Sequence, residues 1–359
     1  MAPSLGLGGY VLLSTNTKHR AFPERQGVEM KMRILSGTDV RRAVTMAEAI
    51  QAVQDAYVQL SAGQAVVPLR TPVPVERRAG VTLFMPAYLS TSDALGAKIV
   101  SVFPENVAQD LPLIHAVVVV VDAKTGRPVA LMDGTYLTAL RTGAASGVST
   151  NLLARPDARV AAVFGAGVQA RTQLEAVCTV RPIDKAWVYD TAPDRAAAYA
   201  QEMQAYGVPV PTDVVVAETP AEALRDADVV CTATTSSVPV FDDADLKPGA
   251  HVSAVGAYTH EMQEIPAETV VRAKVVVDSR VASLAEAGDL IIPLEEGLMA
   301  EADIHGEIGE VASGHIPGRE SDSEVTFFKS VGLAVQDVAV AELILHRAVA
   351  RGLGDEVDL

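Results

Sequence analysis

Cysteine is scarce in this sequence, and its scarcity excludes disulfide-stabilised scaffolds. The 359 residues include two cysteines, Cys178 and Cys231. Two cysteines cannot build the disulfide framework of a small secreted domain, and each lies in an apolar stretch that suits a small buried side chain. This usage is typical of a reducing compartment, so we expect a cytoplasmic protein.

The sequence also lacks an excess of basic residues and any long apolar run. It has 29 Lys and Arg residues against 45 Asp and Glu residues, which is a formal net charge of −16. A negative chain repels phosphate backbones and anionic lipids, so we expect no nucleic-acid partner. No uninterrupted apolar segment has the roughly 18 residues needed to cross a bilayer, so no membrane association is expected.

Aromatic residues are few as well, at 4% of the chain with Trp187 as the single tryptophan, but the remaining composition is that of a globular protein. The length favours two or three domains, at about 150 residues each. The negative charge is concentrated, because eleven acidic residues and one basic residue lie between Ser283 and Glu324. We interpret this acidic segment as solvent-exposed surface.

The first part of the chain is expected to combine helices with a mostly antiparallel sheet. Residues 1–31 show neither helical nor alternating periodicity, and we interpret them as a disordered leader. Two extended runs, at residues 114–121 and 129–132, flank a turn sequence that is typical of a hairpin. A helix is then expected at about residues 137–153.

After this helix, short apolar strands alternate with helices, which is the pattern of a parallel doubly wound sheet. Thr219-Pro220, followed by Glu222, predicts the start of a helix. A last helix around residues 335–344 has an apolar face, and we expect it to return to the first domain. Six strands are expected in the sheet, at residues 160–164, 186–189, 214–217, 229–233, 251–255 and 274–278.

One motif carries a prediction of cofactor binding. The run Gly165-Ala166-Gly167-Val168-Gln169-Ala170 stands between a predicted strand and a predicted helix, as a dinucleotide-binding turn requires. The helix N-terminus would offer free N–H groups to the phosphates. Asp190 ends the second strand, where a carboxylate binds a ribose 2′-hydroxyl and repels a 2′-phosphate. NAD(H) is therefore the preferred cofactor, and Arg195 keeps NADP(H) open as an alternative.

Further cofactor contacts are expected in the loops after the strands, because ligands of such sheets bind beyond the carboxyl ends of the strands. The residues that we assign to these contacts are Thr191, Thr234, Thr235, Val255 and Gly256.

Several strings along the chain carry a resemblance to a known family. They are Phe84-Met85-Pro86-Ala87-Tyr88, Leu95-Gly96-Ala97-Lys98-Ile99-Val100, Arg141 with its neighbours from Thr138 to Ala145, the cofactor motif, Val255 to Tyr258, Met262 to Glu264, Lys329 to Gly332, and Gln336-Asp337. With these strings in this order, the sequence resembles the ornithine cyclodeaminase/mu-crystallin family from about Met32 to near the C-terminus.

The resemblance implies an α/β fold, with a Rossmann-type doubly wound parallel sheet and an α+β domain for substrate binding and dimerisation. We assign residues 32–145 and 333–359 to the second of these domains and residues 146–332 to the NAD(P)-binding domain. The family further implies a homodimer in which the N-terminal domains join into a shared barrel.

The resemblance also implies an enzyme that acts on the C–N bond of a small amino or imino acid and moves a hydride to or from nicotinamide. The family's contacts to the substrate carboxylate fall on Arg70, Lys98 and Arg141. The residue types agree with this role, because a planar guanidinium binds a carboxylate with two hydrogen bonds and a buried lysine can donate a proton.

Two departures from the family pattern favour one reaction. Cyclodeaminases of the family carry a glutamate before Met-Pro and an aspartate in the loop after the fifth strand, where this chain has Leu83 and Tyr258. Without those carboxylates there is no evident general base for oxidising an amine. We therefore expect a ketimine reductase, such as one for pyrroline-2-carboxylate, in which Lys98, a water or the Tyr258 hydroxyl supplies the proton.

Three alternatives stay open. The chain could be an ornithine cyclodeaminase, an alanine-type dehydrogenase, or a non-catalytic protein that binds NADP and a small molecule as mu-crystallin-like proteins can. His305, Glu307 and Glu310 have spacings that could touch one metal ion, but they share no clear helix face, so we expect no metal site.

Overall fold

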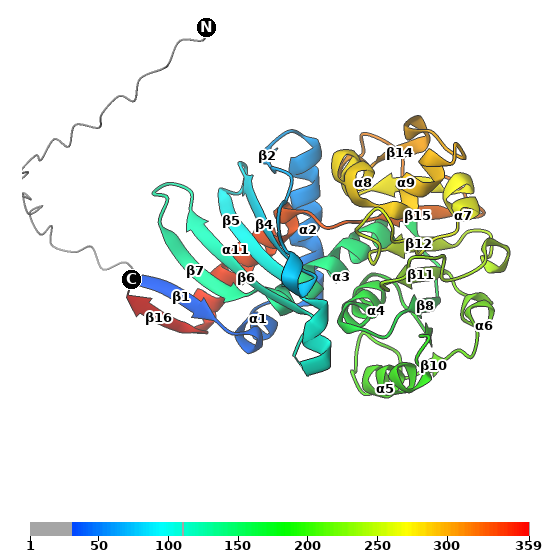
Figure 1. Cartoon of the computed structure of the whole chain (residues 1–359), viewed down its shortest axis with the longest axis horizontal. Helices are drawn as coiled ribbons and strands as arrows, with labels where there is room; N and C mark the ends of the chain where they lie inside the picture. The colour runs from blue at the N-terminus through cyan, green and yellow to red at the C-terminus, as the bar shows by residue number, and fades with distance from the viewer. Residues whose placement is uncertain (1–30, 110, 359) are drawn as a thin grey trace, which may run out of the picture.

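The computed structural model describes residues 31–109 and 111–358. The predicted disordered leader lies outside these residues except for Lys31, which belongs to the first strand. The chain forms two lobes side by side, each built around its own sheet (Figure 1). Within the described residues, no helix combines the length and the apolar character that crossing a membrane requires.

The first lobe contains a mostly antiparallel sheet, as predicted. Its strands are β1 (Lys31–Leu35), β2 (Ala65–Val66), β3 (Thr71–Val75), β4 (Gly80–Leu89), β5 (Ala94–Val102), β6 (Ile114–Asp122), β7 (Pro128–Asp133) and β16 (Asp355–Asp358). The order is β16-β1-β7-β6-β5-β4-β2, with β3 beside β4, and β1 and β7 are a parallel pair. The predicted hairpin is confirmed, because β6 and β7 pair antiparallel.

The central strands of this sheet separate a buried face from an open one, because successive side chains point to opposite faces. Lys98 on β5 and Val118 on β6 are register partners, and both are buried. Phe84, Ile99 and Val117 form the neighbouring row across three strands, and here Phe84 and Val117 are exposed. The open face of the sheet is therefore apolar as well.

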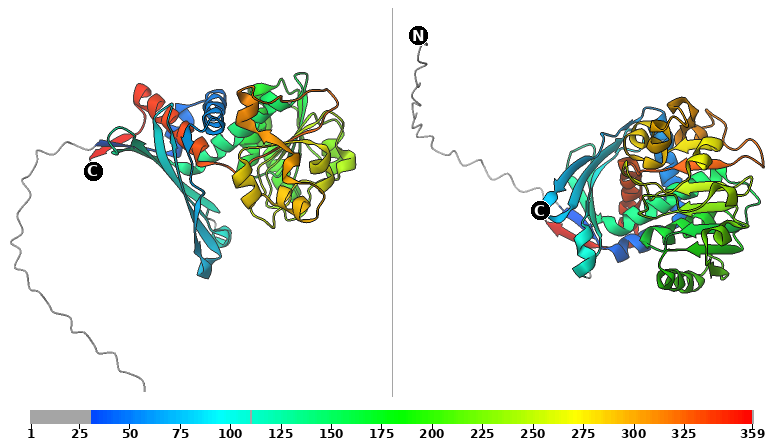
Figure 2. Two further views of the ribbon diagram at one scale, coloured as in Figure 1. Left: turned by 90° about the horizontal axis from the view of Figure 1, so that it is seen from above. Right: turned by 45° about the vertical axis from the view of Figure 1, so that its right-hand side comes forward.

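Helices cover the buried face of this sheet (Figure 2). They are α1 (Gly37–Ala43), α2 (Met46–Ser61), α3 (Gly134–Leu153) and α11 (Ala334–Arg351). The start of α2 is fixed by a capping box, in which the Thr45 hydroxyl accepts from Glu48 N at 3.3 Å and the Glu48 carboxylate accepts from Thr45 N at 3.0 Å. Helix α11 packs on α2, β4 and β5, which confirms the predicted return of the last helix.

The second lobe contains a fully parallel sheet, and the predicted doubly wound fold is confirmed. Its strands are β8 (Val160–Phe164), β9 (Lys185–Tyr189), β10 (Val214–Val216), β11 (Val229–Thr232), β12 (His251–Ala254), β13 (Lys274–Val277), β14 (Ile304–Glu307) and β15 (Thr326–Lys329). Their order is β10-β9-β8-β11-β12-β15-β13-β14. The prediction of six strands is wrong, because β14 and β15 add two, and β15 lies between β12 and β13.

The helices of the second lobe are α4 (Val168–Val180), α5 (Pro193–Gln204), α6 (Pro220–Leu224), α7 (Ala267–Arg272), α8 (Arg280–Glu286), α9 (Gly288–Glu295) and α10 (Ile308–Ala312). The predicted start of α6 is confirmed, because the Thr219 hydroxyl accepts from Glu222 N at 3.1 Å. Cys178 of α4 and Cys231 of β11 are free and buried.

Helix α3 connects the two lobes. It contacts α2 in the first lobe and α4 in the second, and Gly143 permits the close approach, because a Cβ there would overlap the Thr172 carbonyl of α4. The predicted domain boundary between residues 145 and 146 falls inside this helix. The lobes therefore share one rigid element.

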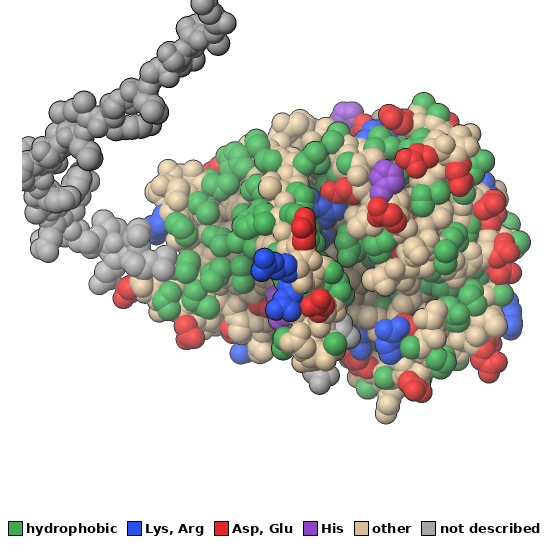
Figure 3. All heavy atoms as spheres, in the orientation of Figure 1, with side chains coloured by type: hydrophobic (Ala, Val, Ile, Leu, Met, Phe, Trp, Pro, Cys, Tyr) green, Lys and Arg blue, Asp and Glu red, His purple; other side chains and the backbone are tan. Residues whose placement is uncertain are grey.

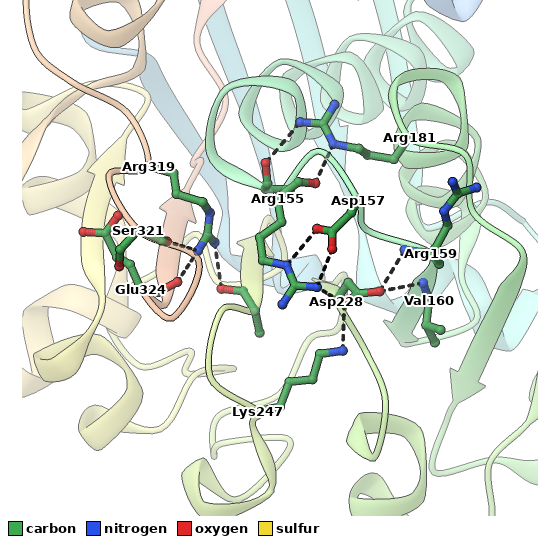
Figure 4. A network of polar contacts seen from close by, with 12 residues as sticks. Arg155, Asp157, Arg159, Val160, Arg181, Asp228, Lys247, Arg319, Ser321 and Glu324 are labelled. Carbon is green, nitrogen blue, oxygen red and sulfur yellow. Dashed lines mark hydrogen bonds and ion pairs between the residues drawn. The ribbon is translucent and has the colours of Figure 1, made fainter.

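The C-terminal end of α3 is anchored by two arginines of the second lobe, Arg181 and Arg319, whose side chains Figure 4 shows. The last carbonyls of a helix lack partners within it and need donors from elsewhere. Arg181 Nη2 donates to the carbonyls of Asn151 and Ala154 at 3.0 and 3.1 Å, and Arg319 Nε donates to the Leu153 carbonyl at 2.6 Å. These bonds hold α3, and with it Arg141, in a fixed position relative to the second sheet.

Candidate active site

The glycine-rich turn lies between β8 and α4. Gly165 has a φ of 94°, and a Cβ there would lie 2.7 Å from the Ala233 carbonyl, so this position requires glycine. Gly167 is the N-cap of α4, and a Cβ at Gly167 would meet no atom within 4 Å. The turn from Gly165 to Ala170 therefore presents the open N-terminus of a 13-residue helix, which suits a phosphate group.

The Asp190 carboxylate is held beside this turn. Its Oδ2 accepts from Ala166 N at 2.9 Å, and its Oδ1 accepts from Ala192 N and from Arg195 Nη2, both at 2.8 Å. Burial alone would raise the pKa of Asp190, but these bonds hold that pKa below its ordinary value. Arg195 is thus paired with the Asp190 carboxylate. Thr191, the next residue after Asp190, lies in the loop that follows β9 (Lys185–Tyr189).

One buried carboxylate holds the loops that follow β11 and β12. Glu264 Oε1 accepts from Thr234 N at 2.6 Å, and Oε2 accepts from Gly256 N at 2.7 Å. Thr235 and Val255 lie on the same two loops. Glu264 is fully buried, so it fixes the edge of the sheet nearest the glycine turn without facing solvent.

Two of the three predicted cationic residues, Lys98 and Arg141, meet at a second buried carboxylate. Lys98 Nζ lies 2.9 Å from Asp337 Oδ1 and 2.8 Å from Asp337 Oδ2. Arg141 donates through Nε to Asp337 Oδ1 at 3.0 Å and through Nη1 to Gln336 Oε1 at 2.8 Å. Gln336 in turn donates to the Tyr57 hydroxyl. Two cations from β5 and α3 therefore share one carboxylate from α11.

Burial lowers the pKa values of the two cations that come from the first sheet and its loops, Lys98 and Arg70. Desolvation, reinforced by the charge of Arg141, lowers the pKa of Lys98 from 10.5 to about 7, although Asp337 opposes the shift. The pKa of Arg70 is also lowered, first by burial and then by Arg141. Arg70 precedes β3 and pairs with Glu286 of α8, with Arg70 Nε 2.7 Å from Glu286 Oε1. The structure thus brings Arg70, Lys98 and Arg141 into one electrostatic cluster.

The loop after β15 is shaped to fit Arg141. Asp278 Oδ2 accepts from Val331 N and Gly332 N, both at 2.9 Å, and from the Ser330 hydroxyl at 2.8 Å. Gly332 has a φ of 82°, and a Cβ there would overlap Arg141 Nη1. The cationic cluster therefore lies against the carboxyl end of β15, at the edge of the sheet where ligands of this fold bind.

A cavity of about 320 Å³ opens beside the cluster. Its walls are formed by Leu60, Val67, Pro68, Leu69, Arg70, Met85, Ser279, Val281, Ala282, Glu286, Glu307, Gly332, Leu333 and Ala334. Tyr258 is half-buried and close enough to Arg70 to influence the pKa of that guanidinium. Leu83 lies two residues before Met85 on β4, on the same face of the strand, so this strand offers no carboxylate to the cavity.

The acidic segment between Ser283 and Glu324 is not surface throughout, and our interpretation of it is wrong in part. Asp289 of α9 is fully buried and forms an ion pair with Lys329 of β15 at 2.7 Å. Glu286 is paired with Arg70. These carboxylates stabilise buried cations, so they do not serve solubility.

The three residues that were considered for a metal site, His305, Glu307 and Glu310, form other contacts. Within residues 31–109 and 111–358 there is no group of three His, Cys, Asp or Glu side chains that could hold a metal ion. Glu307 instead accepts from Arg280 N at 2.9 Å, Glu310 accepts from Glu307 N at 2.8 Å, and His305 contacts the Pro317 carbonyl at 2.8 Å.

Sequence reasoning missed the carboxylates that organise the site. Asp337 had a usable signal, because a charged residue interrupts the apolar face of a predicted helix next to Val335 and Val338. Glu264 and Asp337 both stand in strings that carry the family resemblance, but the strings alone give neither residue a role. Glu286 had no signal of its own, because it stands among other acidic residues.

Comparison with known proteins gives the chain a family. The sequence profile of the ornithine cyclodeaminase/mu-crystallin family matches residues 30–352. A Delta(1)-pyrroline-2-carboxylate reductase of Bacillus cereus is 41% identical over 329 residues, covering 91% of this chain and 100% of the relative.

Two solved structures are also similar to this one. The Thermococcus litoralis Delta(1)-pyrroline-2-carboxylate reductase in complex with NADH and L-proline has a TM-score of 0.87 and 44% identity, over 91% of this chain and 100% of that chain. An archaeal alanine dehydrogenase dimer with bound NAD has a TM-score of 0.85 and 34% identity, over 92% and 100%. The chain therefore belongs to the ornithine cyclodeaminase/mu-crystallin family.

Proposed function

We propose that this chain is an NADH-dependent reductase of small cyclic imino acids of the Δ1-pyrroline-2-carboxylate type. The observation that carries the proposal is the convergence of Arg70, Lys98 and Arg141 on the carboxyl edge of the second sheet. The names of the Bacillus and Thermococcus relatives support the same substrate class.

The substrate carboxylate is the group that this cluster recognises. Arg70 and Arg141 have planar guanidinium groups that can each bind a carboxylate with two hydrogen bonds, and Lys98 adds a buried donor. Asp337 compensates part of this charge, and the remaining positive charge attracts an anion. Because Lys98 and Arg141 are almost fully buried, their electrostatic attraction is screened little by water.

The residues around the glycine turn fit NADH. Gly165, Ala166, Gly167, Val168 and Gln169 would hold the pyrophosphate. Asp190 and Thr191 would bind the adenosine ribose, and Thr234, Thr235, Val255 and Gly256 would face the nicotinamide half. Arg195 would lie beside the ribose, and its ion pair with Asp190 favours NAD(H) over NADP(H). NADH, when bound, supplies the hydride that adds to the imine carbon.

The protein must also deliver a proton to the imine nitrogen. Lys98 is suited to this step, because a pKa of about 7 leaves its ammonium acidic enough to donate near neutral pH. Tyr258, near Arg70, is a second donor. Leu83 and Tyr258 stand where a cyclodeaminase has carboxylates, which favours reduction over ornithine deamination.

We also propose that two copies pair through the open apolar face of the first sheet. Figure 3 shows hydrophobic side chains gathered over this lobe, and the row Phe84, Ile99 and Val117 belongs to that face. The alanine dehydrogenase neighbour is a dimer. In this arrangement residues 32–145 and 333–359 serve substrate binding and dimerisation, and residues 146–332 bind the cofactor. The cysteine usage supports a cytoplasmic location.

The activity is tested with the purified chain, NADH and Δ1-pyrroline-2-carboxylate. We expect NADH oxidation with formation of proline, and no release of ammonia from ornithine with NAD. Arg141→Met should raise the Michaelis constant for the imino acid by about 10-fold or more and leave NADH binding unchanged, because it removes a charged hydrogen-bond partner. Rapid formation of proline and ammonia from ornithine would contradict the proposal.

The pH dependence of reduction follows from Lys98. Its ammonium is present below a pKa of about 7 and is lost as the pH rises through that value. We therefore expect kcat/KM for the imino acid to fall by about tenfold per pH unit above pH 7. In Lys98→Arg the charge persists, so the inflection near pH 7 should disappear. If the two proteins have the same profile, Lys98 is not the titrating group.

Cofactor binding is tested at Gly167. A methyl group there meets no protein atom, so Gly167→Ala should unfold at the same temperature as the wild-type protein. The same methyl group would obstruct the approach of the pyrophosphate, and we expect the Kd for NADH to rise by about tenfold or more. Quenching of Trp187 fluorescence reports binding, because Trp187 lies on β9 near Asp190. Unchanged affinity would argue against this turn as the phosphate site.

The dimer is tested by sedimentation at micromolar concentration. The wild-type chain should sediment as a dimer, and Val117→Lys should sediment as a monomer, because it places a charge on the open apolar face. Val208→Lys is the matched control, because Val208 is 98% exposed on the second lobe. A monomeric wild-type chain, or a Val117→Lys variant that still dimerises, would refute this interface.

A further inference from the structure

The ion pair between Arg70 and Glu286 joins the two lobes. Arg70 immediately precedes β3 in the first lobe, and Glu286 is the last residue of α8 in the second. Arg70 Nε donates to Glu286 Oε1 at 2.7 Å, and Nη2 donates to Oε2. The two side chains are 15% and 19% exposed, so the pair is sheltered from solvent.

The geometry of this pair is the one expected between Arg70 and a substrate. Two parallel hydrogen bonds from a guanidinium to a carboxylate are the usual mode of carboxylate recognition. Arg70 and Glu286 both line the cavity of about 320 Å³, whose other walls are largely apolar. In the ligand-free site, the Glu286 carboxylate therefore pairs with Arg70, one of the three cations assigned to the substrate carboxylate. Both side chains line a cavity large enough for a small ligand.

The charges of the site indicate what replaces this contact. Asp337 stays bound to Lys98 and Arg141, and it is fully buried. When a substrate carboxylate binds Arg70, however, Glu286 loses its partner in a sheltered place, and an unpaired carboxylate there is unfavourable. Once its nitrogen has taken up the proton that reduction requires, an imino acid carries a positive nitrogen on the carbon that bears its carboxylate. Exchange of partners with such a ligand leaves every charge paired.

We propose that Glu286 is a substrate-binding residue whose carboxylate pairs with the protonated nitrogen of the imino acid and of the amino acid product. Its contact with Arg70 is the resting arrangement of the ligand-free site. The inference rests on the proposed function and adds a source of specificity to it. The site selects ligands that carry a cationic nitrogen next to the carboxylate, and it disfavours 2-oxo and 2-hydroxy acids.

The test compares two ring carboxylates that differ in one ring atom. L-Proline has a cationic ring nitrogen, and tetrahydrofuran-2-carboxylate of the same configuration has a neutral oxygen in that place. Their Kd values are measured by calorimetry with the NADH-loaded enzyme. We expect the wild-type enzyme to bind proline more tightly. In Glu286→Gln the Kd for proline should rise by about tenfold or more, because a charged partner is lost, and the Kd for the oxygen analogue should fall, because Arg70 is released.

Glu307→Gln is the matched control. Glu307 lines the same cavity, but it accepts from Arg280 N and from the Ser61 hydroxyl and does not contact Arg70. It should leave the ratio of the two Kd values unchanged. Quenching of Trp187 fluorescence by NADH shows that each variant is folded.

The outcomes separate this inference from the proposed function. If Glu286→Gln leaves the ratio of the two Kd values unchanged, or shifts both Kd values equally, Glu286 is only a counter-ion of Arg70 and the inference is overturned. If the wild-type enzyme binds neither carboxylate and does not reduce Δ1-pyrroline-2-carboxylate, the proposed function fails and the inference fails with it. Selective loss of proline binding in Glu286→Gln alone supports the inference.

Discussion

The buried carboxylate of Asp337 is the interaction on which the rest of the site depends. Moving a charged side chain into a protein interior costs roughly several kcal/mol per ion unless it is paired. Lys98 and Arg141 come from β5 and α3, and both meet Asp337 of α11. The two cations can therefore stay in the core only because the last helix returns across the first sheet. While Lys98 is protonated, one carboxylate faces two cations, and this balance of charge favours the binding of an anion beside them.

Local sequence patterns predicted those elements whose structure depends on residues close together in the chain, such as turns and helix caps. The strand, glycine turn and helix around Gly165 to Ala170 were predicted, because a close backbone approach there requires glycine. The hairpin of β6 and β7 and the start of α6 carry turn and cap residues. Strands β14 and β15 were missed, because Ile-His-Gly-Glu has no apolar run and Thr-Phe-Phe-Lys ends in Lys329. That lysine is acceptable in a buried strand only through Asp289, which lies 40 residues earlier in the chain.

The candidate site was predictable only through the family resemblance. No periodicity marks Arg70, Lys98 or Arg141 as members of one cluster, because Arg70 stands in the loop before β3, Lys98 on β5 and Arg141 on α3. Their partners are also remote, since Lys98 and Asp337 are 239 residues apart and Arg70 and Glu286 are 216 apart. Such long-range pairs form only when the elements and lobes pack together, so no local sequence pattern predicts them. The interpretation of the acidic segment as surface was wrong in part, at Glu286 and Asp289, for the same reason.

The two carboxylates of the cluster differ in a way that decides how a ligand enters it. Asp337 has two cationic partners and no exposure, so a ligand that displaced it would leave a buried anion with nothing to pair with. Glu286 has its ion pair with Arg70 alone among the described residues, and it stands on the cavity wall. An incoming carboxylate therefore meets one fixed counter-ion and one exchangeable one. Exchange at Arg70 is favourable only for a ligand that carries a positive charge beside its carboxylate, as an amino acid and a protonated imino acid do.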